Sequence, residues 1–133
     1  LVPAAFARID DAALRACGVS GNKVLALCDL CRRAETGWVP TARAMPKIAD
    51  DVLIEQLTAV RGIGRWTVEM LLIFRLGRPD ILPVDDLGVR RGAQVLDGLD
   101  VAPTSKQLLS RGEVWAPYRT LASLYLWRIA DGA

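Results

Sequence analysis

The 133-residue sequence contains no histidine and only three cysteines, Cys17, Cys28 and Cys31. The C-x-x-C pair formed by Cys28 and Cys31 has no second pair of ligands, which argues against a zinc site, and the four-cysteine spacing of an iron–sulfur cluster is missing. We therefore expect no iron–sulfur cluster and no disulfide framework. The cysteines are predicted to be buried structural thiols, as in a protein of the reducing cytoplasm.

Long apolar runs are missing as well, although 52% of the residues are hydrophobic. The longest apolar stretch, residues 66–76, is interrupted by Glu69 and Arg75 and is shorter than the about 20 residues that a membrane helix requires. We expect no membrane span and no signal peptide. The composition suffices for one compact core, so residues 1–133 are predicted to form a single domain. Because the chain starts without methionine, we expect its N-terminal part to be incomplete.

Excess charge of one sign is also absent, because the net charge is only +2. This balance alone is weak evidence for a nucleic-acid partner, but basic groups can still gather on one face of a protein. The question of a partner therefore depends on local motifs rather than on overall composition.

Alternating strand patterns are not found, whereas apolar residues recur at helical spacing in nearly every segment. The sequence therefore predicts an all-α fold of six or seven helices. Asp85 or Asp86 is predicted to begin one helix, and Thr104 with Gln107 resembles a capping box that begins another. Pro117 suits the first turn of the last helix. The inward stripe of that helix is expected to consist of Leu121, Leu124 and Tyr125.

Residues 57–67, Leu-Thr-Ala-Val-Arg-Gly-Ile-Gly-Arg-Trp-Thr, carry two glycines around one aliphatic residue between two apolar helical stretches. Gly62 and Gly64 permit a positive φ and close approach of another backbone. The helix after Gly64 begins with N–H groups that have no partner within the helix and with the positive end of its dipole. Such a helix-hairpin-helix turn can bind a DNA phosphate without reading sequence, although a G-x-G alone also fits an ordinary turn. The residues predicted to bind phosphate are Gly62, Ile63, Gly64, Arg65 and Thr67.

A second motif, residues 82–91, places two adjacent carboxylates at a predicted helix start. Neighbouring helical residues point about 100° apart, so Asp85 and Asp86 cannot face one pocket equally. One of them is expected to be only a helix cap, and we assign that role to Asp85.

Three blocks, residues 57–67, residues 82–91 and residues 115–119 with 125–127, together resemble the helix-hairpin-helix superfamily of DNA base-excision glycosylases. Residues 14–20 with Lys23 form a weaker fourth block, and the match is strongest to the bacterial 3-methyladenine DNA glycosylase II branch. The resemblance implies a monomeric DNA repair enzyme at the bacterial nucleoid, acting on double-stranded DNA with a damaged base. Its implied reaction is hydrolysis of the N-glycosidic bond of alkylated purines, such as 3-methyladenine or 7-methylguanine, which leaves an abasic site.

The resemblance places Asp86 in the catalytic register of the alkylation-repair branch. A carboxylate there can stabilise the oxocarbenium character of the sugar and orient or deprotonate the attacking water. Asp85 is the less favoured alternative, because Pro83-Val84-Asp85 resembles the motif of the oxidised-base branches.

Trp66 stands where strand-cleaving relatives carry a nucleophilic lysine, which implies a monofunctional glycosylase. Trp66 and Trp127 resemble pocket aromatics that attract a cationic alkylated purine, although either tryptophan can also belong to the core. Met70 lies one turn after Trp66, where related bacterial enzymes can use an aromatic residue. We therefore predict a base pocket formed by Trp66, Met70 and Trp127.

No cofactor is implied, apart from a structural monovalent cation (Na⁺ or K⁺) on the backbone carbonyls of Thr58, Val60 and Ile63. Such enzymes usually fill the gap left by the extruded base with a glutamine-rich segment upstream of the region that resembles residues 1–20. Either the sequence lacks its first part or the protein has lost this segment, and we expect the former. Two other functions stay open. One is a noncatalytic helix-hairpin-helix DNA-binding module, and the other is a glycosylase for deaminated or oxidised bases.

Overall fold

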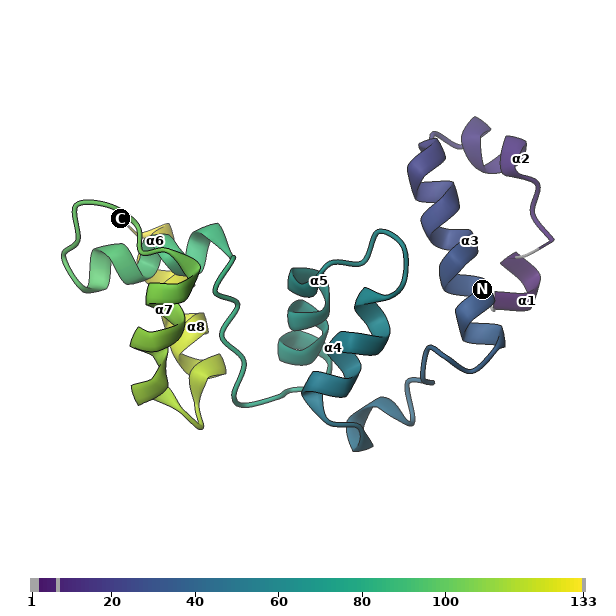
Figure 1. Cartoon of the computed structure of the whole chain (residues 1–133). Helices are drawn as coiled ribbons and strands as arrows, with labels where there is room; N and C mark the ends of the chain where they lie inside the picture. Colours follow the sequence, from purple (N-terminus) through teal and green to yellow (C-terminus); the bar gives the residue numbers. More distant parts are fainter. Residues whose placement is uncertain (1–2, 7, 133) are drawn as a thin grey trace. The chain divides into compact units, whose positions relative to one another are not determined.

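A computed structural model describes residues 3–6 and 8–132 of the chain (Figure 1). The described residues form helices joined by turns and contain no strand, which confirms the all-α prediction. They fall into two compact units, Leu1–Val68 and Glu69–Ala133. Among residues 3–6 and 8–132, no helix is both long and apolar enough to cross a membrane.

The two longest helices of the first unit are α3, with 15 residues, and α4, which leads into the glycine turn. Its buried apolar residues are Val24 of α3, Leu53 and Leu57 of α4, and Val60 and Val68 on either side of the turn. Its elements are α1 (Pro3–Phe6), α2 (Asp11–Ala16), α3 (Gly21–Glu35), the 3-10 helix η1 (Met45–Lys47), α4 (Asp50–Thr58) and the start of α5 (Arg65–Met70).

The cysteines do not lie where the sequence pattern placed them. Cys17 and Cys28 are exposed and Cys31 is half-buried, and all three thiols are free. The prediction of buried thiols is therefore wrong for Cys17 and Cys28. On α3 only Val24 is buried, so the apolar face that continues through Cys28 is open to solvent. Partial burial raises the pKa of the Cys31 thiol.

The second unit surrounds one hydrophobic cluster, formed by Leu82, Val89, Ala93, Leu108 and Leu126. Val84, Trp115 and Trp127 pack against this cluster. The elements of this unit are the end of α5, the π-helix η2 (Leu71–Arg75), α6 (Leu87–Leu96), α7 (Ser105–Arg111), the 3-10 helix η3 (Gly112–Trp115) and α8 (Arg119–Asp131). Thr104 and Gln107 form the expected capping box at the start of α7.

Helices α6 and α8 pack closely because two glycines lie one turn apart on α6. A Cβ atom on Gly92 would lie 2.0 Å from the carbonyl oxygen of Leu126, and one on Gly88 would lie 2.8 Å from Cδ1 of Trp127. A side chain on Gly92 would therefore push the α8 backbone away, whereas one on Gly88 would push against the Trp127 indole. The two glycines set the spacing between the helix that follows Asp86 and the helix that carries Trp127.

Two expectations for the last helix are wrong. Pro117 lies before α8, whose N-cap is Tyr118. The predicted inward stripe of Leu121, Leu124 and Tyr125 is 54%, 42% and 64% exposed, whereas Ser123 and Leu126 are buried. The inward face carries Leu126, which belongs to the hydrophobic cluster of this unit and whose backbone packs against Gly92 of α6. The Ser123 hydroxyl on this face lies 2.8 Å from the Arg119 carbonyl and 3.1 Å from the Ile81 carbonyl.

Candidate active site

The glycine turn joins the end of α4 to the start of α5. The Ile63 N–H donates to the Val60 carbonyl at 3.1 Å, and Gly62 has a φ of +78°, a conformation that favours glycine. Of the two glycines that permit a positive φ, only Gly62 adopts one. Gly64 instead precedes α5, where its carbonyl accepts the Val68 N–H at 3.3 Å.

The first turn of α5 presents the residues that the sequence assigned to phosphate and base recognition. A Cβ atom on Gly64 would meet nothing within 4 Å, so this backbone can be approached closely. Arg65 and Thr67 are exposed, and half of the Trp66 surface is accessible. Met70, in the second unit, is half-buried. The turn is therefore followed by a helix start that carries exposed side chains, among them the Trp66 indole.

Asp86 is the N-cap of α6 and accepts two hydrogen bonds on one oxygen. Its Oδ1 atom accepts the Val89 N–H at 2.8 Å and the Nε1–H of Trp127 at 2.8 Å. The side chain is half-buried and lies at the positive end of the α6 dipole. Two donors from different helices thus fix the orientation of this carboxylate.

Besides its hydrogen bond to Asp86, the indole of Trp127 has an aromatic contact. Its ring stacks on Phe74 of η2, with centroids 5.9 Å apart and planes inclined by 25°. Phe74 is 66% exposed, so an aromatic surface accompanies the carboxylate. The structure therefore brings Asp86, Trp127 and Phe74 together within the second unit.

Sequence reasoning did not assign a role to Phe74 or Gly88. Phe74 follows Trp66 and Met70 at a regular spacing of four residues, so the helical period could have indicated it. Gly88 lies in the first turn of α6. Glycine is unfavourable in a helix, and its presence there was the only sign in the sequence that this position has a special role. In the structure a Cβ atom there would lie 2.8 Å from Trp127 Cδ1 and 3.2 Å from Asp86 Oδ1. Glycine at this position permits the indole–carboxylate hydrogen bond.

Asp85 has different surroundings from Asp86. It is exposed, and its Oδ1 atom accepts the Ser105 hydroxyl at 2.6 Å. The capping role that the sequence assigned to Asp85 belongs to Asp86, because only Asp86 has its side chain bonded to the first turn of α6. The two adjacent carboxylates are therefore held by different helices.

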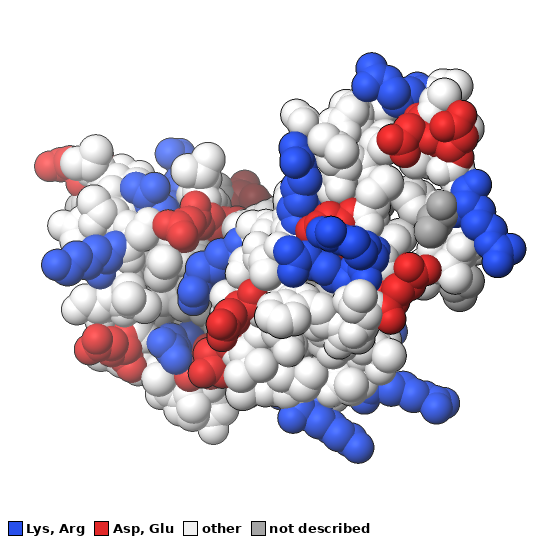
Figure 2. All heavy atoms as spheres, turned by 45° about the vertical axis from the view of Figure 1, so that its right-hand side comes forward, with Lys and Arg blue, Asp and Glu red and all other residues white. Residues whose placement is uncertain are grey.

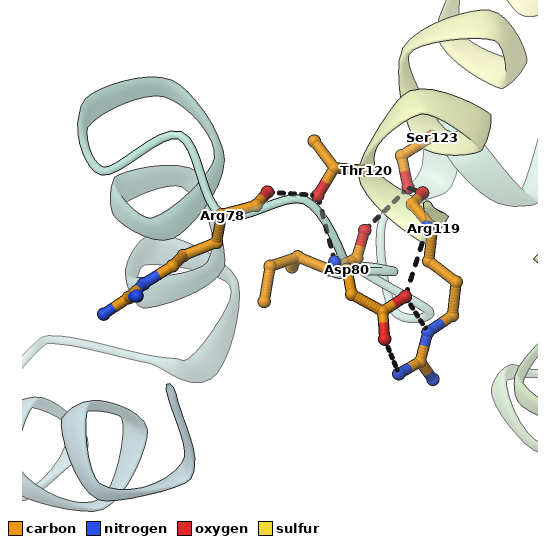
Figure 3. Close-up of polar contacts among 6 residues, drawn as sticks. Arg78, Asp80, Arg119, Thr120 and Ser123 are labelled. Atoms are coloured by element: carbon orange, nitrogen blue, oxygen red, sulfur yellow. Dashed lines mark hydrogen bonds and ion pairs between the residues drawn. The ribbon is translucent and has the colours of Figure 1, made fainter. Parts of the chain in front are cut away.

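The segment that leads to Asp86 is fastened to the start of α8 (Figure 3). Asp80 binds Arg119 with both carboxylate oxygens, each at 2.7 Å. The Thr120 hydroxyl donates to the Arg78 carbonyl at 2.6 Å and accepts the Ile81 N–H at 2.9 Å. The hydrogen bonds from Arg119 hold the pKa of Asp80 below its usual value.

Residues 78–86 are therefore attached to α8 at both ends. Arg119 holds the Asp80 end, and Trp127 holds the Asp86 end. Both contacts come from one helix, so α8 holds both ends of the segment that carries Asp86 to the start of α6.

Comparison with known proteins identifies the family. The model of the HhH-GPD superfamily, described as base excision DNA repair proteins, matches residues 1–117. The chain belongs to this superfamily. It is 44% identical over 115 residues to DNA-3-methyladenine glycosylase 1 of Schizosaccharomyces pombe, a match that covers 86% of this chain and 50% of the relative.

Two solved structures extend the similarity to three dimensions. The 3-methyladenine DNA glycosylase Mag1 of Schizosaccharomyces pombe, in complex with abasic DNA, matches with a TM-score of 0.85 and 42% identity, over 96% of this chain and 62% of that one. A DNA-3-methyladenine glycosidase from Bacillus halodurans matches with a TM-score of 0.88 and 41% identity, over 97% and 59%. The chain thus spans about half of the curated relative and about three fifths of the solved structures. These similarities confirm the resemblance drawn from the three sequence blocks.

Proposed function

We propose that this protein is a monofunctional DNA glycosylase that removes alkylated purines from double-stranded DNA and leaves an abasic site. The single observation that carries the proposal is the Asp86 carboxylate, fixed by the Val89 N–H and the Trp127 indole at the start of α6. The similarity to 3-methyladenine DNA glycosylases supports the substrate class.

The proposed reaction needs a fixed anion more than it needs an acid. N-alkylation gives the purine a positive charge, so the base leaves as a neutral molecule when it takes the electron pair of the glycosidic bond. The sugar then develops oxocarbenium character, which the Asp86 carboxylate stabilises. Water adds to the C1′ carbon, and Asp86 or solvent accepts its proton. A carboxylate whose orientation is already set need not reorganise during this step.

Aromatic side chains supply the proposed recognition of the damaged base. An electron-rich ring attracts a cationic purine by about 0.5 to 2 kcal/mol, and Trp127 is held for this role by Asp86 and Phe74. Trp66, whose indole is exposed, and Met70 are the other two residues proposed to recognise the base. Since Trp66 stands in place of a lysine, no amine is supplied there to form a Schiff base with the sugar, and water is the proposed nucleophile.

The glycine turn is the proposed DNA anchor, with Gly62, Ile63, Gly64, Arg65 and Thr67 around one backbone phosphate. The turn also fits a monovalent cation, because the carbonyl oxygens at the end of a helix lack partners within the helix and suit a hard ion. The Val60 carbonyl accepts one N–H, from Ile63, and has a second lone pair. Thr58, Val60 and Ile63 would hold the ion, which would add positive charge beside the phosphate.

No other cofactor is part of the proposal. We further propose that the protein acts as a monomer on DNA of a bacterial nucleoid in the cytoplasm.

The test of this function is base release. Full-length protein is incubated with duplexes carrying 3-methyladenine, 7-methylguanine, hypoxanthine or 8-oxoguanine, and the free base is identified by chromatography. Release of the methylated purines supports the proposal. Binding of methylated DNA without release of any base would instead indicate a noncatalytic DNA-binding module, and release of only 8-oxoguanine or hypoxanthine would indicate a different substrate class.

A further inference from the structure

The first half of the glycine turn, Arg61 and Gly62, contacts helix α3. A Cβ atom on Gly62 would lie 3.1 Å from the Cβ of Ala26, so the turn backbone packs against this helix. One turn further along α3, the Oδ2 atom of Asp29 accepts the main-chain N–H of Arg61 at 2.9 Å. The turn is therefore fixed by a close packing contact and by a hydrogen bond to a carboxylate 32 residues away in sequence.

The same carboxylate binds two arginine side chains of its own helix. Arg33 Nε lies 2.9 Å from Oδ2, and Arg32 Nη2 donates to Oδ1. The hydrogen bonds from the Arg61 main chain, Arg32 and Arg33 hold the pKa of Asp29 well below its usual range, with the Arg61 bond as the largest cause. Asp29 is therefore ionised at neutral pH and orders the two guanidinium groups beside the turn.

These side chains line a surface cleft of about 560 Å³, which is bounded by Arg32, Arg33 and Arg61 together with Leu25, Cys28, Asp29 and Ala59. Three guanidinium charges against one carboxylate leave two positive charges in the cleft. Figure 2, which turns the α3 side of Figure 1 forward, shows basic side chains gathered around acidic atoms. Arg61 is bonded to Asp29 through its main chain only, so its guanidinium is not used in that contact.

We propose that this cleft binds a phosphate of the DNA backbone, next to the phosphate assigned to the glycine turn, with Arg61 as the main donor. This inference rests on the proposed function, because DNA is the anion that the neighbouring turn is suited to bind. A guanidinium matches a phosphate with two parallel N–H donors, which makes arginine the suitable side chain. Asp29 acts as a positioning residue that holds both the turn and the arginine cluster.

The salt dependence of DNA binding tests the cleft. The Kd of the full-length protein for a fluorescent duplex with a stable abasic-site analogue is measured over a series of KCl concentrations. Each phosphate contact contributes about 0.9 to the slope of log K against log salt concentration. Arg61→Gln keeps the main-chain N–H that bonds Asp29, so the slope should become less steep by about 0.9 and binding at low salt should weaken several-fold.

Arg111→Gln is the control, because the Arg111 guanidinium, which pairs with Asp97 at 3.0 Å, does not line the cleft. It removes the same charge and is expected to retain the wild-type slope. An unchanged slope in Arg61→Gln, or an equal change in Arg111→Gln, would overturn the phosphate site.

The positioning role of Asp29 is tested by comparing two substitutions that remove the same negative charge. Asp29→Asn keeps an oxygen that can accept the Arg61 N–H, whereas Asp29→Ala does not. If only the charge of Asp29 matters, the two variants should bind DNA equally. If Asp29 positions the turn, Asp29→Ala should bind DNA several-fold more weakly than Asp29→Asn. Thermal melting checks that the folded fraction of the two variants is the same. Equal Kd values would refute this role.

Base release by the wild type is measured separately. Binding with the expected slope change but without base release would overturn the proposed function and leave the cleft supported. Base release with an unchanged slope would support the proposed function and overturn the phosphate site in the cleft.

Discussion

Gly88→Ala should slow catalysis with little loss of stability. The added methyl group would contact the side chains of Trp127 and Asp86 rather than the backbone of α8. It would lie 2.8 Å from Trp127 Cδ1, about 0.6 Å short of an ordinary contact of 3.4 Å. If the indole moves by that amount, the 2.8 Å bond from Nε1 to Asp86 lengthens to about 3.4 Å and is effectively lost. A hydrogen bond to a charged group contributes about 1.5 to 3 kcal/mol.

If that bond acts in the transition state, excision should slow by roughly 10- to 150-fold. Alanine is favoured over glycine in helices by up to about 1 kcal/mol, which offsets part of the strain in the folded protein. We therefore expect Gly88→Ala to melt within a few degrees of the wild type. The assay is single-turnover release of 7-methylguanine, combined with thermal melting followed by circular dichroism.

Gly92→Ala is the contrasting variant on the same helix. Its Cβ atom would meet the Leu126 backbone at 2.0 Å, which no side-chain rotation relieves, so overpacking should destabilise the fold by about 1 to 3 kcal/mol or more. Wild-type excision by Gly88→Ala would refute the reasoning, because the Trp127–Asp86 bond would then be dispensable.

Three further outcomes follow from the same contacts. Trp127→Phe keeps a ring but removes the Nε1–H donor, so excision at saturating DNA should fall by roughly tenfold or more while binding of abasic DNA stays within about twofold. Because hydrogen bonds from Arg119 lower the pKa of Asp80, their stabilising contribution is present above the ordinary aspartate pKa and is lost as pH falls through the lowered value. The melting-temperature difference between wild type and Asp80→Asn should therefore be largest near pH 7 and shrink toward pH 3, and a constant difference would contradict this. Gly62→Ala forces a side chain into a φ of +78°, which costs about 1 to 2 kcal/mol and should weaken DNA binding, measured as Kd by fluorescence anisotropy; an unchanged Kd would count against the turn as the anchor.

Local signals in the sequence were sufficient for the features that depend on neighbouring residues. The glycine turn and the capping box of Thr104 and Gln107 follow from residues within a few positions of one another, and both are found. The start of α6 was also predicted, but only the structure distinguished Asp86 from Asp85 as its cap.

Features that depend on distant residues were not predictable in this way. The α8 helix carries apolar residues on several sides, so the sequence pattern favoured Leu121 and Tyr125 as the buried face. The face that is buried carries Leu126, which packs in one cluster with Leu82 and Val89, residues far away in the sequence. The bond between Trp127 and Asp86 likewise joins residues 41 positions apart, and it depends on Gly88, whose role is visible only when α8 is in place.

The most direct test of the central claim is single-turnover release of 3-methyladenine and 7-methylguanine by Asp86→Asn, with Asp85→Asn as the matched control. Removing an electrostatic group that acts in the transition state typically costs about 100- to 1,000-fold in rate. We predict a loss of that order in Asp86→Asn, with wild-type binding of abasic DNA, and near-normal release by Asp85→Asn. Normal release by Asp86→Asn together with loss in Asp85→Asn would contradict the account.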